Sequence, residues 1–121
     1  MSLVHHLVSP TVWSAFEGKD YYEAESLLTE KFIHFSLPEQ VEGTLNRFFG
    51  GTELLYLLHI NSDLLTSTLV FEASGEHGVF PHLYGPLNKH AVMAIEEIRP
   101  QADGNFVFPV DNRVYQLFEG K

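Results

Sequence analysis

The chain has 121 residues, of which 45% are hydrophobic and 19% are charged, as in an ordinary globular protein. Sixteen acidic residues against seven Lys and Arg give a formal charge of −9. This disfavours nucleic acid as the main partner, because such binding needs clustered basic residues. The absence of cysteine excludes disulfides, thiol nucleophiles and Cys-ligated zinc. We therefore expect one domain, residues 1–121, whose chemistry depends on histidine, carboxylate, hydroxyl or backbone groups.

We expect neither a membrane-spanning segment nor a secretory signal from this sequence. The longest apolar runs, such as residues 54–58, are far shorter than the roughly 20 residues that span a bilayer. The first six residues lack the basic and apolar regions of a signal peptide. These observations predict a cytoplasmic protein with no membrane partner, and they leave the oligomeric state open.

The N-terminal part of the chain predicts a strand followed by two short helical segments. Residues 3–8 carry apolar side chains on both faces, which favours a strand in a central position. Ser9 can cap a helix that begins at Pro10 and ends near Gly18, because proline is favoured in the first helical turn. A further helical turn is expected within residues 20–31.

A second strand and the clearest helix of the sequence follow. Residues 32–36 are predicted to form the strand, and the S-x-x-E spacing from Ser36 to Glu39 predicts a capping box at the start of the helix. Gly50 and Gly51 mark its end. The apolar residues at helical spacing are Val41, Leu45, Phe48 and Phe49.

The second half of the chain predicts mainly strands. Residues 80–86 are interrupted by proline, which disfavours a central strand and predicts a rigid edge segment or loop. Asp103 and Gly104 predict a turn. Other strands are expected at residues 53–60, 66–73, 91–99, 106–109 and 114–117, with a helical turn at 88–90. Because strands outnumber helices without regular alternation, we predict an α+β fold with a mixed, mostly antiparallel sheet and short helices.

Histidines on the predicted strands are the main candidates for chemistry. A single imidazole in such a setting is usually a hydrogen-bonded core residue, but several together suggest a site. The strand-borne histidines are His5, His6, His34 and His82. The other three, His59, His77 and His90, lie at a strand end or in loops, and we expect them to face solvent.

Other polar residues on the strands add to these candidates. His34 and Ser36 are two residues apart, so they point to the same face, although capping also explains Ser36. Glu72 lies mid-strand among hydroxyl residues, where it is either functional or simply solvated. His82 and Tyr84 share a face in the proline-rich segment, whose restricted φ would hold both side chains rigidly.

Several short motifs of the chain resemble those of domain-of-unknown-function family 952. The similarity covers about residues 3–109 and leaves residues 110–121 as a tail. Its motifs are Val4-His5-His6-Leu7, Trp13, Phe32-Ile33-His34-Phe35-Ser36, Gln40-Val41, Phe71-Glu72 and the segment from Phe80 to Leu87. The resemblance implies a small, bacterial, functionally uncharacterised protein with a fold similar to the ADP-ribosyltransferase domain.

The ADP-ribosyltransferase resemblance implies roles for some of these residues and suggests NAD as a cofactor. In such transferases a histidine of the first strand contacts the nicotinamide-side ribose, an aromatic or hydroxyl residue lies on a later strand, and a glutamate often assists the glycosidic step. By position, His6 matches the first role. Ser36 or Tyr84 matches the second, and Glu72 the third.

Three hypotheses follow from the sequence. The leading one is a cleft that binds a nucleotide-like or other small anionic ligand. Its catalytic candidates are His6, His34 and Glu72, and its ligand-binding candidates are Ser36, His82 and Tyr84. The second is a divalent-metal site built from His6, His34, His82 and Glu72. The third is a non-enzymatic binding or accessory module whose histidines only complete a polar network.

Overall fold

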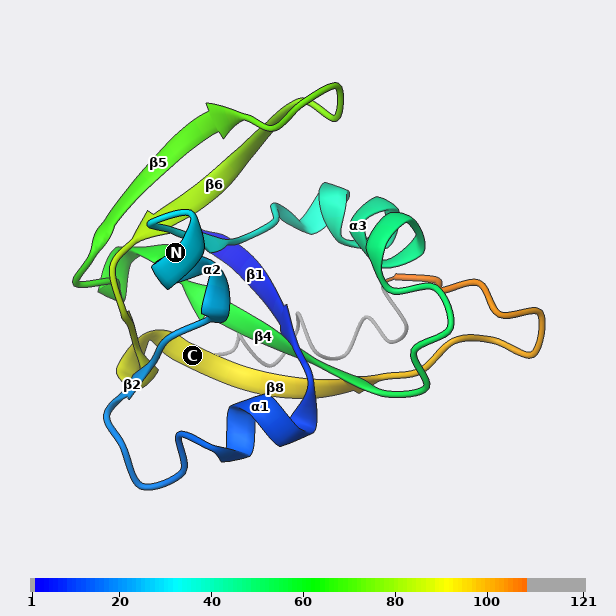
Figure 1. Ribbon diagram of the computed structural model, residues 1–121, viewed down its shortest axis with the longest axis horizontal. Helices are drawn as coiled ribbons and strands as arrows, with labels where there is room; N and C mark the ends of the chain where they lie inside the picture. Colours follow the sequence, from blue (N-terminus) through cyan, green and yellow to red (C-terminus); the bar gives the residue numbers. More distant parts are fainter. Residues whose placement is uncertain (1, 109–121) are drawn as a thin grey trace.

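The computed structural model describes residues 2–108 and has an α+β architecture built from small antiparallel sheets (Figure 1). One sheet has the strand order β1-β4-β8, a second pairs β2 with β7, and a third has the order β3-β6-β5. The strands are β1 (Leu3–Val8), β2 (Tyr21–Tyr22), β3 (Ile33–His34), β4 (Leu55–Asn61), β5 (Thr68–Ala73), β6 (Val79–Tyr84), β7 (Leu87–Asn88) and β8 (Val92–Ile98). The predicted α+β class, with mostly antiparallel sheets and short helices, is therefore confirmed.

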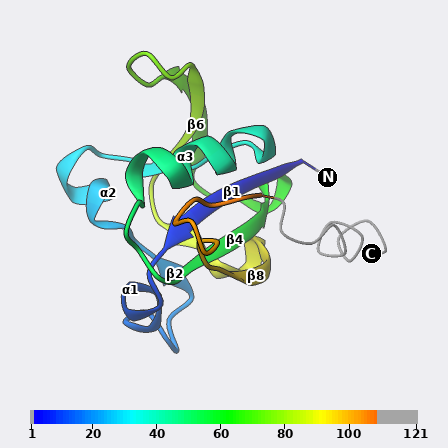
Figure 2. The ribbon, with the colours of Figure 1, turned by 90° about the vertical axis from the view of Figure 1, so that its right-hand side faces the viewer.

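The helices are short and lie in the connections between strands. Ser9 caps the first as predicted, since its hydroxyl accepts the Val12 N–H at 3.2 Å and Pro10 occupies the first turn. The helices are α1 (Pro10–Ser14), α2 (Glu25–Thr29) and α3 (Val41–Phe48), with single 3₁₀ turns at Pro38–Gln40, Ser62–Leu64 and Lys89–Ala91. Figure 2 shows α3 lying beside β1, with the β5–β6 hairpin projecting beyond it.

The predicted capping box at Ser36 and Glu39 is wrong. The chain first makes the 3₁₀ turn, and the Gln40 side-chain oxygen accepts the Leu37 N–H at 2.9 Å. The reason is Pro38, which sets the start of the turn one residue after the expected cap. The Ser36 hydroxyl lies instead 3.4 Å from the hydroxyl of Thr44 on α3.

The proline-rich segment forms β6, the central strand of its sheet, so the prediction of an edge segment or loop is wrong. Pro81 lacks an N–H, but its carbonyl still accepts the Phe35 N–H at 3.0 Å. Strand β3 ends at His34, so the missing N–H falls beyond the last paired residue on that side. Because the partner strand β3 is short, Pro81 leaves no ladder hydrogen bond unmade, and the reason for predicting an edge segment does not apply.

Strand β1 connects the first and third sheets. Along one edge it pairs with β4. On the other edge His5 N–H donates to the Ser36 carbonyl at 2.8 Å, and Ser36 N–H donates to the His5 carbonyl at 2.7 Å. In the strand order β1 lies at the edge of the β1-β4-β8 sheet, so the predicted central position is not confirmed, but the isolated bridge on its other edge brings Ser36 beside β1.

The core contains two clusters of buried residues. One lies around Val4, Ile33 and Leu83 and includes residues of all three sheets, while the other lies between α3 and the β1-β4-β8 sheet. His59 is fully buried beside His5, with ring centroids 4.9 Å apart, so the prediction that His59 faces solvent is wrong. It lies inside β4, opposite His5 in the strand register, and its Nε2 is 2.9 Å from Glu96 Oε1.

The segment after β8 packs against α3 instead of forming the strand expected at 106–109. Within the described part of this range, residues 106–108, the Phe106 N–H donates to Asn46 Oδ1 at 2.8 Å and the Asn46 amide donates to the Phe106 carbonyl at 3.0 Å. A helix side chain therefore supplies the hydrogen bonds that a neighbouring strand would otherwise make. The strand predicted at 114–117 lies outside the described residues.

Candidate functional site

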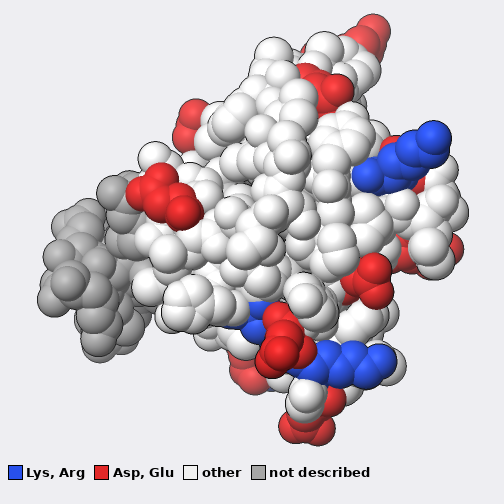
Figure 3. Space-filling model, turned by 90° about the vertical axis from the view of Figure 1, so that its left-hand side faces the viewer, with Lys and Arg blue, Asp and Glu red and all other residues white. Residues whose placement is uncertain are grey.

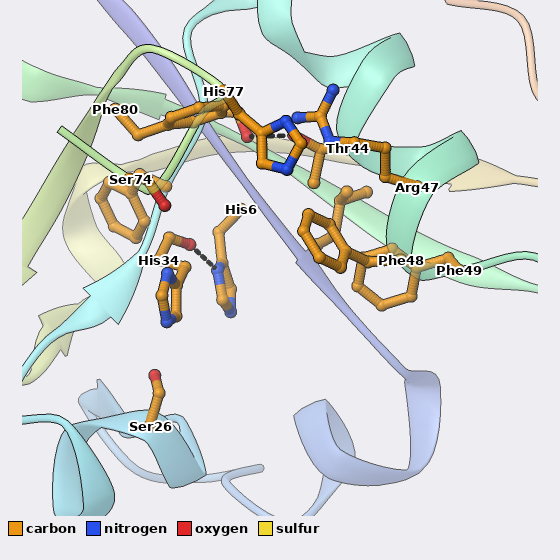
Figure 4. A pocket seen from close by; sticks show the side chains of 13 residues that line it. His6, Ser26, His34, Thr44, Arg47, Phe48, Phe49, Ser74, His77 and Phe80 are labelled. Atoms are coloured by element: carbon orange, nitrogen blue, oxygen red, sulfur yellow. Dashed lines mark hydrogen bonds between the residues drawn. The ribbon is translucent and has the colours of Figure 1, made fainter.

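A cavity of about 320 Å³ lies where β1 and β3 meet α3 and the tip of the β5–β6 hairpin (Figure 4). Its wall is largely aromatic, with hydroxyl groups between the rings. The rings belong to Phe35, Phe48, Phe49 and Phe80, and the hydroxyls to Ser26, Ser36, Thr44 and Ser74. Helix α3 buries Val41 and Leu45 in the core, which leaves Thr44, Arg47 and Phe48 on the cavity side.

Arg47 is the only Lys or Arg among the described residues that line this cavity. It makes no hydrogen bond or ion pair with residues 2–108, and its guanidinium carbon lies 5.6 Å from the centre of the Phe48 ring. Room for this side chain comes from Gly43, where an added Cβ would lie 3.0 Å from Arg47 Nη1. The cavity thus presents one unpaired cation among aromatic rings.

His6 reaches the cavity with both ring nitrogens already hydrogen-bonded. Its Nδ1 is 2.7 Å from the His34 carbonyl oxygen, and its Nε2 is 2.8 Å from the Tyr22 hydroxyl. Because a carbonyl only accepts, Nδ1 carries the proton and Nε2 accepts from Tyr22. Burial lowers the pKa of His6 to about 4 and raises the pKa of Tyr22. His6 is therefore a neutral link between β1, β2 and β3.

Glu72, His82 and Tyr84 form a hydrogen-bonded cluster on one face of the β3-β6-β5 sheet. His82 Nδ1 and the Tyr84 hydroxyl donate to the same Glu72 oxygen, at 2.8 and 2.6 Å. These two hydrogen bonds lower the pKa of Glu72, and the carboxylate raises the pKa of Tyr84. Glu72 is therefore held as a carboxylate.

His34 lies between the cavity and this cluster. It pairs with His82 in the strand register, and their ring centroids are 5.4 Å apart. Its Nε2 is 3.1 Å from a Glu30 carboxylate oxygen, and about half of the His34 side chain is exposed. The predicted residues thus form two groups. His6, His34 and Ser36 line the cavity, whereas Glu72, His82 and Tyr84 lie beside it.

The metal-site alternative receives no support from this arrangement. Within residues 2–108, no three His, Cys, Asp or Glu side chains are placed to hold one ion. Both His6 nitrogens are hydrogen-bonded to protein groups, and His82 Nδ1 faces Glu72. Three free nitrogens are therefore not gathered in one place.

Sequence reasoning missed several residues of the site. Arg47 lies on a predicted helix, but the helical spacing alone does not say which side faces a cavity. His77 was expected in solvent and is exposed, yet it also lines the cavity and contacts the Phe48 ring, with centroids 6.2 Å apart. Phe32 lies flat on His82, with ring centroids 4.0 Å apart and an interplanar angle of 13°. Only the pairing of β3 with β6 brings these two rings together.

This geometry defines a small antiparallel α+β protein with a cavity beside a carboxylate–histidine cluster. The model of the family "Protein of unknown function (DUF952)" matches residues 7–95, and the chain belongs to that family. The resemblance inferred from the short motifs is thereby confirmed.

Solved structures similar to this chain include those of CC0527 of Caulobacter crescentus, a structural genomics target. Its crystal structure is 32% identical, with a TM-score of 0.79, covering 88% of this chain and 94% of that one. Its solution NMR structure is 33% identical, with a TM-score of 0.75, covering 87% and 91%. No curated protein matches the sequence. Among the helices of residues 2–108, none has the length and apolar character needed to cross a membrane.

Proposed function

We propose that the protein binds a small ligand that carries a planar ring and an anionic group, in the cavity between α3 and the β1–β3 junction. The observation that carries this proposal is the guanidinium of Arg47, which lies in a wall of aromatic rings and has no ion-pair partner among residues 2–108. Arginine binds carboxylate and phosphate groups through paired N–H donors, and aromatic rings favour a flat ligand.

The charge of the protein makes this arginine unusual. The chain carries 16 acidic against 7 basic residues. On the face shown in Figure 3, the few Lys and Arg side chains lie among Asp and Glu side chains. A cation with no carboxylate partner among residues 2–108 is therefore available to an external anion. The cavity volume of about 320 Å³ is at the lower end of ligand pockets, roughly 300–1,000 Å³, and suits one nucleoside-sized group.

A nucleotide is the first ligand class to test, because the motif resemblance implies an ADP-ribosyltransferase-like fold and NAD-related chemistry. Both His6 nitrogens are already hydrogen-bonded to protein groups. In that setting His6 would contact the ligand with the face of its ring and would hold His34 in position. Glu72 and Tyr84 would act from the neighbouring cluster. Release of nicotinamide from NAD measures whether binding leads to cleavage.

Calorimetric or NMR titration tests the binding proposal. Phenyl phosphate, AMP and NAD should bind more tightly than inorganic phosphate, which lacks the ring, or benzyl alcohol, which lacks the charge. Arg47→Met should weaken phenyl phosphate binding about tenfold or more, because a charge-assisted hydrogen bond contributes about 1.5–3 kcal/mol.

Arg99→Met is the matched control, since Arg99 is an exposed arginine 3.6 Å from Glu97 and does not line the cavity. It should leave the affinity unchanged. Equal affinity of wild-type protein and Arg47→Met for phenyl phosphate would overturn the proposal.

A further inference from the structure

His82 presents one ring nitrogen that no group among residues 2–108 uses. A carboxylate accepts hydrogen bonds, so His82 Nδ1 carries the proton that it donates to Glu72 at 2.8 Å. In the neutral ring, Nε2 then has a free lone pair. Nε2 is buried and has no hydrogen-bond partner among residues 2–108, and the residue is 4% exposed.

A buried acceptor without a partner lowers stability, because it has lost its hydrogen bond to water. An apolar residue in place of His82 on β6 would have avoided this cost. Instead the protein fixes the orientation of the ring with a carboxylate, and holds that carboxylate with Tyr84 at 2.6 Å. This arrangement resembles the orienting of a catalytic imidazole by a carboxylate.

Phe32 covers one face of the imidazole. Its ring lies parallel to His82 with centroids 4.0 Å apart, and it is only partly buried. The preceding residue, Lys31, has a φ of 76°, a left-handed conformation that costs energy for a residue with a side chain. The Ser26 hydroxyl donates to the Phe32 carbonyl at 2.8 Å and holds this turn in place. A strained turn thus positions the Phe32 ring on one face of His82, while the His34 ring packs edge-on against it with centroids 5.4 Å apart.

We propose that the Glu72–His82 pair is a proton-accepting site for a hydroxyl group of a ligand, and that Phe32 covers this site. The ligand hydroxyl donates to Nε2. In the full transfer one proton passes from the ligand oxygen to Nε2, no other bond is made or broken, and Glu72 stabilises the resulting imidazolium. The site does not require an anion at Arg47, so it stands independently of the binding proposed above.

Phenol and anisole form a matched pair of probes, because both carry the ring and only phenol carries the O–H. In protein labelled with ¹⁵N-histidine, NMR should show His82 protonated on Nδ1 and unprotonated on Nε2. Millimolar phenol should shift the Nε2 resonance of His82, whereas anisole should not. Phe32→Ala removes the stacked ring and should increase the shift of the His82 Nε2 resonance with phenol. If that variant does not fold, Phe32→Leu takes its place.

Acylation by diethyl pyrocarbonate tests the role of Phe32 separately. Nε2 attacks a carbonyl carbon of the reagent, the N–C bond forms as the C–O bond to the leaving ethyl carbonate breaks, and the Nδ1 proton is lost to Glu72 or to solvent. Mass spectrometry should show that in wild-type protein His82 is acylated at least tenfold more slowly than the exposed His77 and His90. Phe32→Ala should remove most of this difference without changing the two controls. Adding Glu72→Gln to Phe32→Ala should slow the acylation of His82 again. The amide can donate a hydrogen bond to Nδ1, which moves the ring proton to Nε2.

Two results would overturn the proposal. One is a His82 ring protonated on Nε2 in wild-type protein at neutral pH. The other is a Phe32→Ala protein in which phenol and anisole have the same effect on His82. Loss of phenyl phosphate binding in Arg47→Met concerns only the cavity, so the two proposals fail separately.

Discussion

Gly43 lies one helical turn before Arg47, and the space where a Gly43 side chain would stand is occupied by the Arg47 guanidinium. An added Cβ would lie 3.0 Å from Nη1, the nearest of three atoms that all belong to Arg47. Glycine inside a helix costs roughly 0.5–1 kcal/mol relative to alanine. The helix therefore gives up stability at the position that lets the arginine lie against the cavity.

Gly43→Ala should separate stability from binding. The free energy of unfolding should rise by up to about 1 kcal/mol, because alanine favours the helix and the arginine end is flexible enough to move away. Affinity for phenyl phosphate should fall, since the guanidinium leaves its place. Urea denaturation and calorimetry measure the two effects. Gly50→Ala is the control, as no atom lies within 4 Å of a Cβ there. Unchanged affinity in Gly43→Ala would show that Gly43 does not position Arg47 for binding.

Substitution of His82 by Phe should leave the fold as stable or make it more stable by about 1 kcal/mol. It removes the unpaired Nε2, keeps the stack on Phe32, and leaves Glu72 partly exposed with its Tyr84 hydrogen bond. Chemical denaturation measures this. If stability instead dropped by more than about 2 kcal/mol, the cluster would be a structural network.

Tyr22→Phe should destabilise the protein by about 1–2 kcal/mol. It removes the hydroxyl that donates to His6 Nε2 at 2.8 Å and leaves that buried acceptor unpaired. Thermal or urea unfolding is the measurement. Tyr21→Phe is a close control, because the neighbouring Tyr21 is 55% exposed. Equal effects of the two substitutions would contradict the assigned hydrogen bond.

Stability should decrease as the pH falls from about 6.5 towards 4. Burial lowers the pKa of His6 from 6.5 to about 4, so in this range the unfolded chain binds a proton that the folded chain does not. The contribution of neutral His6 to the free energy of unfolding is complete above pH 6.5. It amounts to about 3 kcal/mol, at 1.36 kcal/mol per pKa unit. Burial of His5, whose pKa falls to about 3, adds to the same trend.

Urea denaturation at a series of pH values measures this dependence. His6→Gln, which does not titrate, should show a smaller slope between pH 6.5 and 4 than the wild type. His90→Gln alters an exposed histidine and should keep the full slope. A wild-type stability that is constant over this range would show that His6 and His5 are not buried in neutral form.

Local sequence signals predicted the elements whose hydrogen bonds are local. The cap at Ser9, the strand at residues 3–8 and the helix around Leu45 follow from neighbouring residues, and the structure contains them. The prediction failed at β6, where the effect of Pro81 depends on how far the partner strand extends. It also failed at His59, whose burial depends on its place opposite His5.

The sequence by itself determined the fold class, the absence of cysteine chemistry, the family and the histidines worth testing, because composition, side-chain alternation and short motifs are local properties. Alternation also placed His34 with Ser36 and His82 with Tyr84 on common strand faces. Only the tertiary structure decided that His6 has no free nitrogen, that His82 has one, and that Arg47 lines a cavity. Hydrogen-bond partners and burial come from strand pairing and helix packing between residues far apart in the chain, and one-dimensional spacing does not specify them.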